Sequence, residues 1–318
     1  MSTSRGTLPR PSPSNNAVVV LGAGRGLAAV LRALRGQGTR LTVIVSIADR
    51  RGDGDEEQRR VTGASVEDLR RSLEALSGEE GALLRAMRRP LTIERLGQHP
   101  LGNLVIASAA SAFDDYGRAS AWFGEQLGIE GSVLPATSEA VQWDLEPFED
   151  AGDANAQGDS ADEPSRLRFI GDRIDSPLAA IEAIEHCHCA LLAPGSLYRS
   201  VLSTAAVPDL AAALKATQAR VVWIANLEHD PDQRPSMTVV GHLLALRSNG
   251  VRVDAALYDP TAALKFDAGE LERYGVEGIP RTLRNTRDPR THDPERLRSA
   301  LGELIALQPA AGPGRPRD

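Results

Sequence analysis

Short apolar runs along this 318-residue chain alternate with segments of helical periodicity. The apolar runs predict strands at residues 17–22, 40–48, 132–134, 140–145, 189–193, 220–225 and 251–257. Apolar positions three and four residues apart predict helices at 25–36, 69–76, 81–87, 104–113, 119–127, 178–186, 208–217 and 236–248. Because the strands are apolar on both sides, we expect an α/β protein in three layers, with a mostly parallel sheet between two layers of helices.

The composition changes outside these elements and marks the limits of the folded part. Residues 1–16 are polar and rich in proline, and residues 308–318 are rich in proline, glycine and arginine, so we expect both ends to be disordered. The stretch 149–165 is rich in aspartate, glycine and alanine, which indicates an excursion at the surface. We expect residues 17–307 to form a single domain.

The overall charge and hydropathy limit the kinds of partner. The net charge is −7, and nothing in this balance favours nucleic acid or an anionic membrane. No apolar run reaches membrane-spanning length, and the polar start lacks the apolar segment of a signal peptide. We therefore expect a cytoplasmic protein that binds neither nucleic acid nor membranes. A homo-oligomer is compatible with the sequence.

The two cysteines lie in the segment His186-Cys187-His188-Cys189, which raises the question of a metal site. Alternating residues of a strand point to opposite faces, so the four side chains cannot all reach one ion. Zinc ligands are usually separated by a longer gap or lie on different elements. The spacing favours the alternative, in which Cys187 ends a helix and Cys189 enters a buried strand.

The first predicted strand runs into a glycine-rich turn, Gly-Ala-Gly-Arg-Gly-Leu at residues 22–27. Its spacing is close to the dinucleotide fingerprint, although the last glycine comes one residue early. A helix that starts here presents free N–H groups that suit a phosphate. Asp49 follows the second strand, where an NAD enzyme would have its ribose-binding carboxylate. From these residues alone, a nucleotide site and an ordinary strand-to-helix turn both stay open.

A second turn, Pro194-Gly195-Ser196, follows the predicted strand at 189–193 and precedes Tyr198. The free N–H groups and the Ser196 hydroxyl could hold a phosphate or a sugar, or Ser196 could be an ordinary helix N-cap. Two such turns in one parallel sheet suggest a nucleotide-type ligand at the carboxyl ends of the strands.

Six segments in register resemble the YvcK/CofD-like family, also called the gluconeogenesis-factor family, from about Val18 to about Arg281. The family patterns are Gly-Gly-Gly-Thr-Gly-Leu, Ala-Asp-Asp-Gly-Gly, Gly-Asp-(Ile/Val)-Arg and His-x-(Leu/Val)-Gly-Asn-Leu, followed by two later blocks. The matching segments of this chain are residues 22–27, 48–52, 67–70, 99–104, 133–137 and 194–202. Asn226 also falls where the family has an asparagine.

The resemblance implies a Rossmann-like fold with a nucleotide at the first glycine turn. One branch of the family is the 2-phospho-L-lactate transferase, which moves a phospholactyl group from a guanylated donor with a divalent cation. The other branch looks non-catalytic. Its members bind UDP-sugars, notably UDP-N-acetylglucosamine, and influence central carbon metabolism, cell-wall synthesis and cell shape. The segments after Asn103 look closer to this second branch.

The chain departs from the family pattern at the residues where the family would hold the phosphate and the metal ion. Arg50 replaces the second aspartate of the acidic pair, Arg51 replaces a glycine, and Arg25 replaces a threonine. Magnesium prefers carboxylate oxygens, so Arg50 should weaken Mg²⁺ binding and leave Asp49 as its one ligand there. A guanidinium can instead bind a diphosphate directly. The alternative is that these arginines are solvated charges on a decayed site.

A second departure follows Asn226, where residues 228–234 keep only the length of the family segment. This replacement argues for an altered second substrate or none. His99 and Asn103 keep the family pattern, and the Asn103 amide can both donate to and accept from a sugar or base. The alternative is that both residues only cap a helix that begins near Leu104.

The sequence supports one main interpretation and two alternatives. We expect a nucleotide-sugar-binding regulator with no catalytic residue; the alternatives are a phospho-lactate-type transferase and a protein that has lost its ligand and acts only through a partner. Mg²⁺ is the one cofactor left open. The predicted ligand-binding residues are Gly22, Gly24, Arg25, Gly26, Leu27, Asp49, Arg50, Asp68, Arg70, His99, Gly102, Asn103, Pro194, Gly195, Ser196, Tyr198 and Asn226.

Overall fold

A computed structural model describes most of the chain. The described residues are 17–52, 66–78, 81–93, 97–147, 164–229 and 237–306. The predictions of disorder at 1–16 and 308–318 lie outside these ranges, and so does nearly all of the 149–165 excursion.

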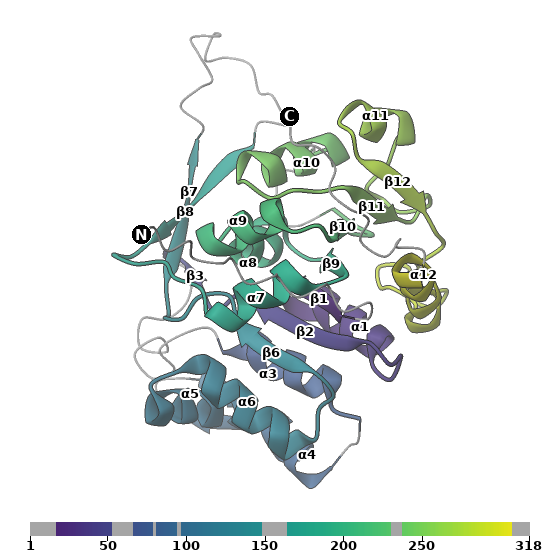
Figure 1. Ribbon diagram of the computed structural model, residues 1–318. Helices are drawn as coiled ribbons and strands as arrows, with labels where there is room; N and C mark the ends of the chain where they lie inside the picture. The colour runs from purple at the N-terminus through teal and green to yellow at the C-terminus, as the bar shows by residue number, and fades with distance from the viewer. Residues whose placement is uncertain are drawn as a thin grey trace, which may run out of the picture.

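Seven parallel strands form the central sheet in the order β12-β11-β10-β9-β1-β2-β6 (Figure 1). From β1 the chain first adds β2 and β6 on one side, and then adds β9, β10, β11 and β12 on the other. The order therefore reverses between β1 and β9. The strands are β1 Ala17–Gly22, β2 Arg40–Val45, β6 Ser132–Pro135, β9 Cys189–Leu192, β10 Arg220–Ile224, β11 Ala255–Tyr258 and β12 Glu277–Pro280.

Helices cover both faces of this sheet, which confirms the predicted three-layer α/β architecture (Figure 1). One face carries α1 Gly24–Leu34, α3 Glu67–Leu76, α4 Ala82–Arg88, α5 Leu101–Phe113, α6 Tyr116–Leu127 and α12 Pro294–Ala306. The other face carries α7 Leu178–His186, a short π-helix η1 Leu197–Leu202, α8 Ser203–Ala205, α9 Pro208–Ala216, α10 Val239–Ser248 and α11 Ala268–Arg273. Within the described residues, no helix is long and apolar enough to cross a lipid bilayer.

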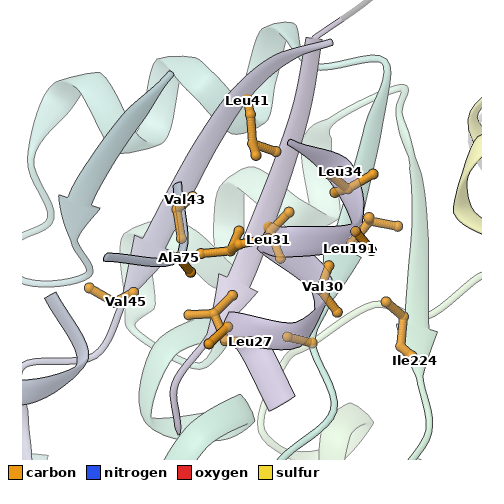
Figure 2. Close-up of a cluster of buried hydrophobic side chains, with 14 of the residues drawn as sticks. Leu27, Val30, Leu31, Leu34, Leu41, Val43, Val45, Ala75, Leu191 and Ile224 are labelled. Atoms are coloured by element: carbon orange, nitrogen blue, oxygen red, sulfur yellow. The ribbon is translucent and has the colours of Figure 1, made fainter. Parts of the chain in front are cut away.

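Strand alternation divides the core into two layers. In β1, Val18 and Val20 pack on the α1 side of the sheet, whereas Val19 and Leu21 pack on the opposite side. Figure 2 shows the α1 side, where leucines of α1 lie against apolar residues of β2 and β9. Both faces of each central strand are buried, and this explains why the strands read as continuous apolar runs.

Two small sheets lie beside the main one. The first has the order β3-β7-β8, with bounds Asp49–Arg50, Gln142–Pro147 and Ser165–Ile170, and its β7–β8 pair is antiparallel. The second pairs β4 Pro90–Ile93 with β5 Gly97–Pro100. The sequence did not predict β3, β4 or β5, because these strands are short and lack a clear apolar alternation. Strand β8 was not predicted either, although its Leu167 and Phe169 alternate with Arg166 and Arg168.

The cysteine segment has the structure that the spacing favoured. Helix α7 ends at His186, Cys187 caps it, and Cys189 is the first residue of β9. Both thiols are free and buried, and burial raises the pKa of Cys187 to about 12. Among the described residues, no group of three histidine, cysteine or acidic side chains is arranged to hold a metal ion.

Candidate functional site

The two predicted turns lie next to each other at the carboxyl edge of the sheet. They follow the neighbouring strands β1 and β9, where Leu21 is paired with Leu192 and the Ala193 N–H donates to the Leu21 carbonyl at 2.8 Å. This is the point at which the strand order reverses. In open α/β sheets, ligands bind outside the carboxyl ends of the strands at such a reversal.

Direct contacts hold the two turns together. A Cβ on Gly26 would lie 1.8 Å from the carbonyl oxygen of Pro194, so α1 packs on the second turn at a distance that only glycine allows. Ser200 of η1 accepts from the Ala23 N–H at 2.7 Å and donates to the Ala23 carbonyl at 2.9 Å. Ser200 is not among the predicted site residues, although it lies in the family-like segment 194–202.

Asn226 fixes the second turn from the neighbouring strand. It follows the end of β10 by two residues, and its amide accepts from the Gly195 N–H at 2.7 Å and donates to the Gly195 carbonyl at 2.8 Å. A Cβ on Gly195 would lie 2.7 Å from the Ser200 hydroxyl oxygen. Asn226 and Ser200 therefore hold the backbone of Gly195 in place from two sides.

Gly24 differs from the other glycines of the two turns. Its φ is +76°, which disfavours other residues, and a Cβ there would meet no atom within 4 Å. Its N–H donates to Asp68 Oδ1 at 2.8 Å. Burial raises the pKa of Asp68, and the Gly24 hydrogen bond and the nearby Arg71 oppose this shift. The start of α1 is thus open above Gly24 and carries a carboxylate at its side.

The first turn of α3 connects the glycine turn to the His99–Asn103 segment. Two residues after Asp68, Arg70 donates from Nε to Asn103 Oδ1 at 2.7 Å. A Cβ on Gly102 would lie 2.7 Å from Arg70 Cδ, so α5 approaches α3 closely at this glycine. Helix α5 begins at Leu101 and has no side-chain cap. Asn103 therefore lies inside α5 and binds Arg70 through its side chain, so it does not act only as a cap of this helix.

The two predicted anion-binding arginines lie in different settings. Arg25 is exposed in the first turn of α1. Arg50 lies in β3, opposite Trp143 of β7, and its guanidinium carbon is 5.9 Å from the centre of the Trp143 ring. Trp143 is buried, so it forms a fixed surface for Arg50. Asp49 is the preceding strand residue and therefore points to the other face.

The remaining predicted residues have mostly structural contacts. Leu27 is buried in the core. The Tyr198 hydroxyl accepts from the Ser165 N–H at 2.9 Å and thereby holds the start of β8. Ser196 is the N-cap of η1, with the Arg199 N–H at 3.4 Å from its hydroxyl. His99 is half-buried in β5, where it pairs with Leu91. The structure does not bring Tyr198 together with the glycine turn through any described contact.

A polar cluster that was not predicted from the sequence lies farther along the same edge. Asp259 follows β11 directly, and its carboxylate accepts from Thr261, from the Leu283 N–H at 2.7 Å and from the Arg284 N–H at 2.9 Å. Burial opposes ionisation of Asp259, but these hydrogen bonds outweigh it and lower its pKa. Burial also lowers the pKa of nearby His292 to about 4. The signal was available, since Asp259 stands just after a predicted strand.

Part of the altered segment after Asn226 can also be located. Glu228 pairs with Arg284 at 3.1 Å, and His229 is exposed. Residues 230–236 lie outside the described part of the chain. The start of this segment therefore contacts Arg284, whose backbone N–H donates to Asp259.

Together, the sheet order and the two turns define a Rossmann-like α/β protein whose candidate site lies at the strand reversal, where folds of this class bind their ligands. The family model for 2-phospho-L-lactate transferase CofD matches residues 18–304. This match covers most of the chain, so the chain belongs to the CofD family. The predicted resemblance to the YvcK/CofD-like family is confirmed.

Several relatives agree with this assignment. The chain is 30% identical to the gluconeogenesis factor of Halalkalibacterium halodurans over 233 residues, which are 72% of either protein. It is 26% identical to the gluconeogenesis factor of Bacillus subtilis over 311 residues, covering 91% of this chain and 98% of the relative. A crystal structure of a UPF0052-family protein from Bacillus halodurans matches with a TM-score of 0.75 and 25% identity, covering 90% of this chain and 98% of that one.

Proposed function

We propose that this protein binds a nucleotide-sugar of the UDP-sugar class at the start of α1, and that it acts as a regulator of central carbon metabolism, cell-wall synthesis or cell shape. In this proposal the protein is cytoplasmic and catalyses no reaction. The ligand's diphosphate lies over residues 24–26. The gluconeogenesis-factor names of its relatives support the regulatory role.

The open space above Gly24 is the observation that carries the proposal. Packing closes the equivalent space at Gly22, Gly26 and Gly195, where a Cβ would lie 3.0 Å or less from a neighbouring atom. Of the four glycines in the two joined turns, only Gly24 faces open space. Asp68 already binds the Gly24 N–H, so the diphosphate would use the next N–H groups of α1.

The family resemblance also implies a divalent cation, and the residues described here do not fit one well. The position of the second family carboxylate holds the Arg50 guanidinium, which lies over Trp143. A fixed positive charge next to a Mg²⁺ site opposes cation binding. Among the described residues, no carboxylate pairs with Arg50. Its charge is therefore available to the ligand's diphosphate, together with that of Arg25.

A calorimetric titration with UDP-N-acetylglucosamine tests the proposal, first with Mg²⁺ and then with a chelator. We expect binding of the same affinity in both conditions. Binding that requires Mg²⁺ would instead support the transferase alternative and contradict the role given to Arg50. No heat with either UDP-N-acetylglucosamine or GDP would contradict nucleotide binding, and it would favour a protein that acts only through a partner.

A further inference from the structure

The hydrogen bond between Arg70 and Asn103 allows only one orientation of the Asn103 amide. A guanidinium can only donate hydrogen bonds, so the group of Asn103 that faces Arg70 Nε at 2.7 Å must be its carbonyl oxygen. The amide NH₂ group then points the other way. No described residue accepts a hydrogen bond from Asn103 Nδ2. Asn103 is 6% exposed, so the pair is held in a largely dry environment.

Two neighbours keep Arg70 in this position. Glu74, one turn further along α3, forms an ion pair with Arg70, and the two side chains are only 7% and 9% exposed. Arg88 of α4 holds the other carboxylate oxygen of Glu74 at 2.9 Å. Because Gly102 has no side chain, α5 can lie directly on the Arg70 stem. Arg70 is therefore engaged on all sides and is not available as a phosphate ligand.

The charges around this pair cancel. Arg70, Arg71 and Arg88 are positive, and they are matched by three carboxylates in the same network of ion pairs. Those carboxylates belong to Glu67, Asp68 and Glu74. A neutral site of this kind has no net attraction for a phosphate, and a ligand group that accepts a hydrogen bond without carrying charge suits it better.

We infer that Asn103 offers the ligand a hydrogen-bond donor and no acceptor, and that the subsite at the start of α5, on the side of Asn103 away from Arg70, takes an uncharged acceptor such as a carbonyl oxygen. An N-acyl group on the sugar and a carbonyl of the nucleobase both have this chemistry. Arg70 acts as the positioning residue that sets the orientation of the amide. This inference rests on the proposed function, because it describes one part of the same nucleotide-sugar site.

The substitution Asn103→Asp tests the inference. An aspartate keeps the size of the side chain and pairs with Arg70 at least as well, but it presents an oxygen where the NH₂ group was. We expect UDP-N-acetylglucosamine to bind about 10- to 100-fold more weakly, the usual loss for an unpaired buried polar group. Asn285→Asp adds the same charge on the loop after β12 and keeps the Asn285 acceptor bonds, so it should leave the affinity unchanged.

Two further measurements distinguish a reversed hydrogen bond from the added charge and from misfolding of the variant. At about 0.5 M NaCl, where charges are screened within about 5 Å, the loss in Asn103→Asp should persist if a reversed hydrogen bond causes it. In the wild-type protein with ¹⁵N-labelled asparagine, the Asn103 NH₂ resonances should shift downfield when the ligand is added. The NMR measurement does not require that the variant fold.

The possible failures can be told apart. If the wild-type protein binds no nucleotide, the proposed function fails and the inference fails with it. If the wild-type protein binds but folded Asn103→Asp binds equally well, only the inference on Asn103 fails. A loss that disappears in high salt, or unchanged Asn103 NH₂ resonances, would likewise contradict the inference and leave nucleotide binding intact.

Discussion

Gly26 of α1 lies directly against the carbonyl group of Pro194, with 1.8 Å between that oxygen and the position of a Cβ. This contact joins the first glycine turn to the second turn, although the two are far apart in the sequence. The Ser200 bonds to Ala23 and the Asn226 bonds to Gly195 support the same junction. The candidate site is therefore one connected unit, and its parts should respond to substitution together.

The first prediction concerns this junction. Gly26→Ala should lower the free energy of unfolding by at least about 3 kcal/mol, because the added methyl group overlaps the Pro194 carbonyl. Gly24→Ala is the matched control, since its methyl group would enter open space and cost only about 1–2 kcal/mol through the positive φ. Urea denaturation of both variants measures the difference. Equal losses would mean that the two turns do not pack as described.

The second prediction concerns the ligand site. Gly24→Asp should abolish nucleotide-sugar binding, because a carboxylate would then stand beside the diphosphate and Asp68. Gly24→Ala has the same backbone strain without the charge, so it should retain more affinity. Calorimetry measures both. If Gly24→Asp also leaves the cellular function unchanged, the protein works without its ligand, and the third alternative is correct.

The third prediction concerns Arg50. Arg50→Gln removes the charge and should weaken ligand binding about tenfold or more, as expected for a lost charge-assisted hydrogen bond. Arg50→Lys keeps the charge but not the flat group that lies over Trp143, so it should restore only part of the affinity. Exposed Arg290 offers a control in Arg290→Gln. Wild-type affinity in Arg50→Gln would show that this guanidinium is a solvated surface charge.

The fourth prediction concerns Asp68 and pH. Burial raises the pKa of Asp68 above the ordinary value of 3.8, so the folded protein favours the protonated carboxyl group. The free energy of unfolding therefore falls as the pH rises through the raised pKa. Asp68→Asn keeps an acceptor for Gly24 and removes this loss. The stability of Asp68→Asn relative to the wild type should therefore be greater at pH 7 than at pH 4.

Asp288 is the matched control for this pH dependence. Its hydrogen bonds with Arg290 lower its pKa, so its contribution to stability is present at pH 7 and is lost in acid. Asp288→Asn should therefore show the opposite dependence on pH. Urea denaturation at the two pH values tests both variants. A stability difference for Asp68→Asn that does not change with pH would contradict the raised pKa.

Much of the fold could be predicted from the apolar pattern alone. The predicted strand at 17–22 and the predicted helix at 178–186 agree with β1 and α7 residue for residue. Helix α12 was not predicted, although Leu297, Leu301 and Leu304 have helical spacing and are buried. The periodicity that marks this helix was therefore present in the sequence. The short strands β3, β4 and β5 depend on partners in other segments, which a local pattern does not contain.

The segments of the candidate site could be predicted, but their contacts could not. The sequence indicated the glycine turn, Asp68, Arg70 and Asn103 as separate candidates. It did not indicate that Arg70 would be neutralised by Glu74 and would orient Asn103. Such pairings depend on how α3 and α5 pack, and this is decided by the core beneath them. Side-chain roles therefore required the three-dimensional structure.

A crystal structure of the protein with UDP-N-acetylglucosamine would test the central claim most directly. We predict that the diphosphate will lie within hydrogen-bonding distance of the N–H groups of Arg25 and Gly26, at the junction of the two turns. A ligand bound elsewhere on the molecule, with no contact to residues 24–26, would contradict it.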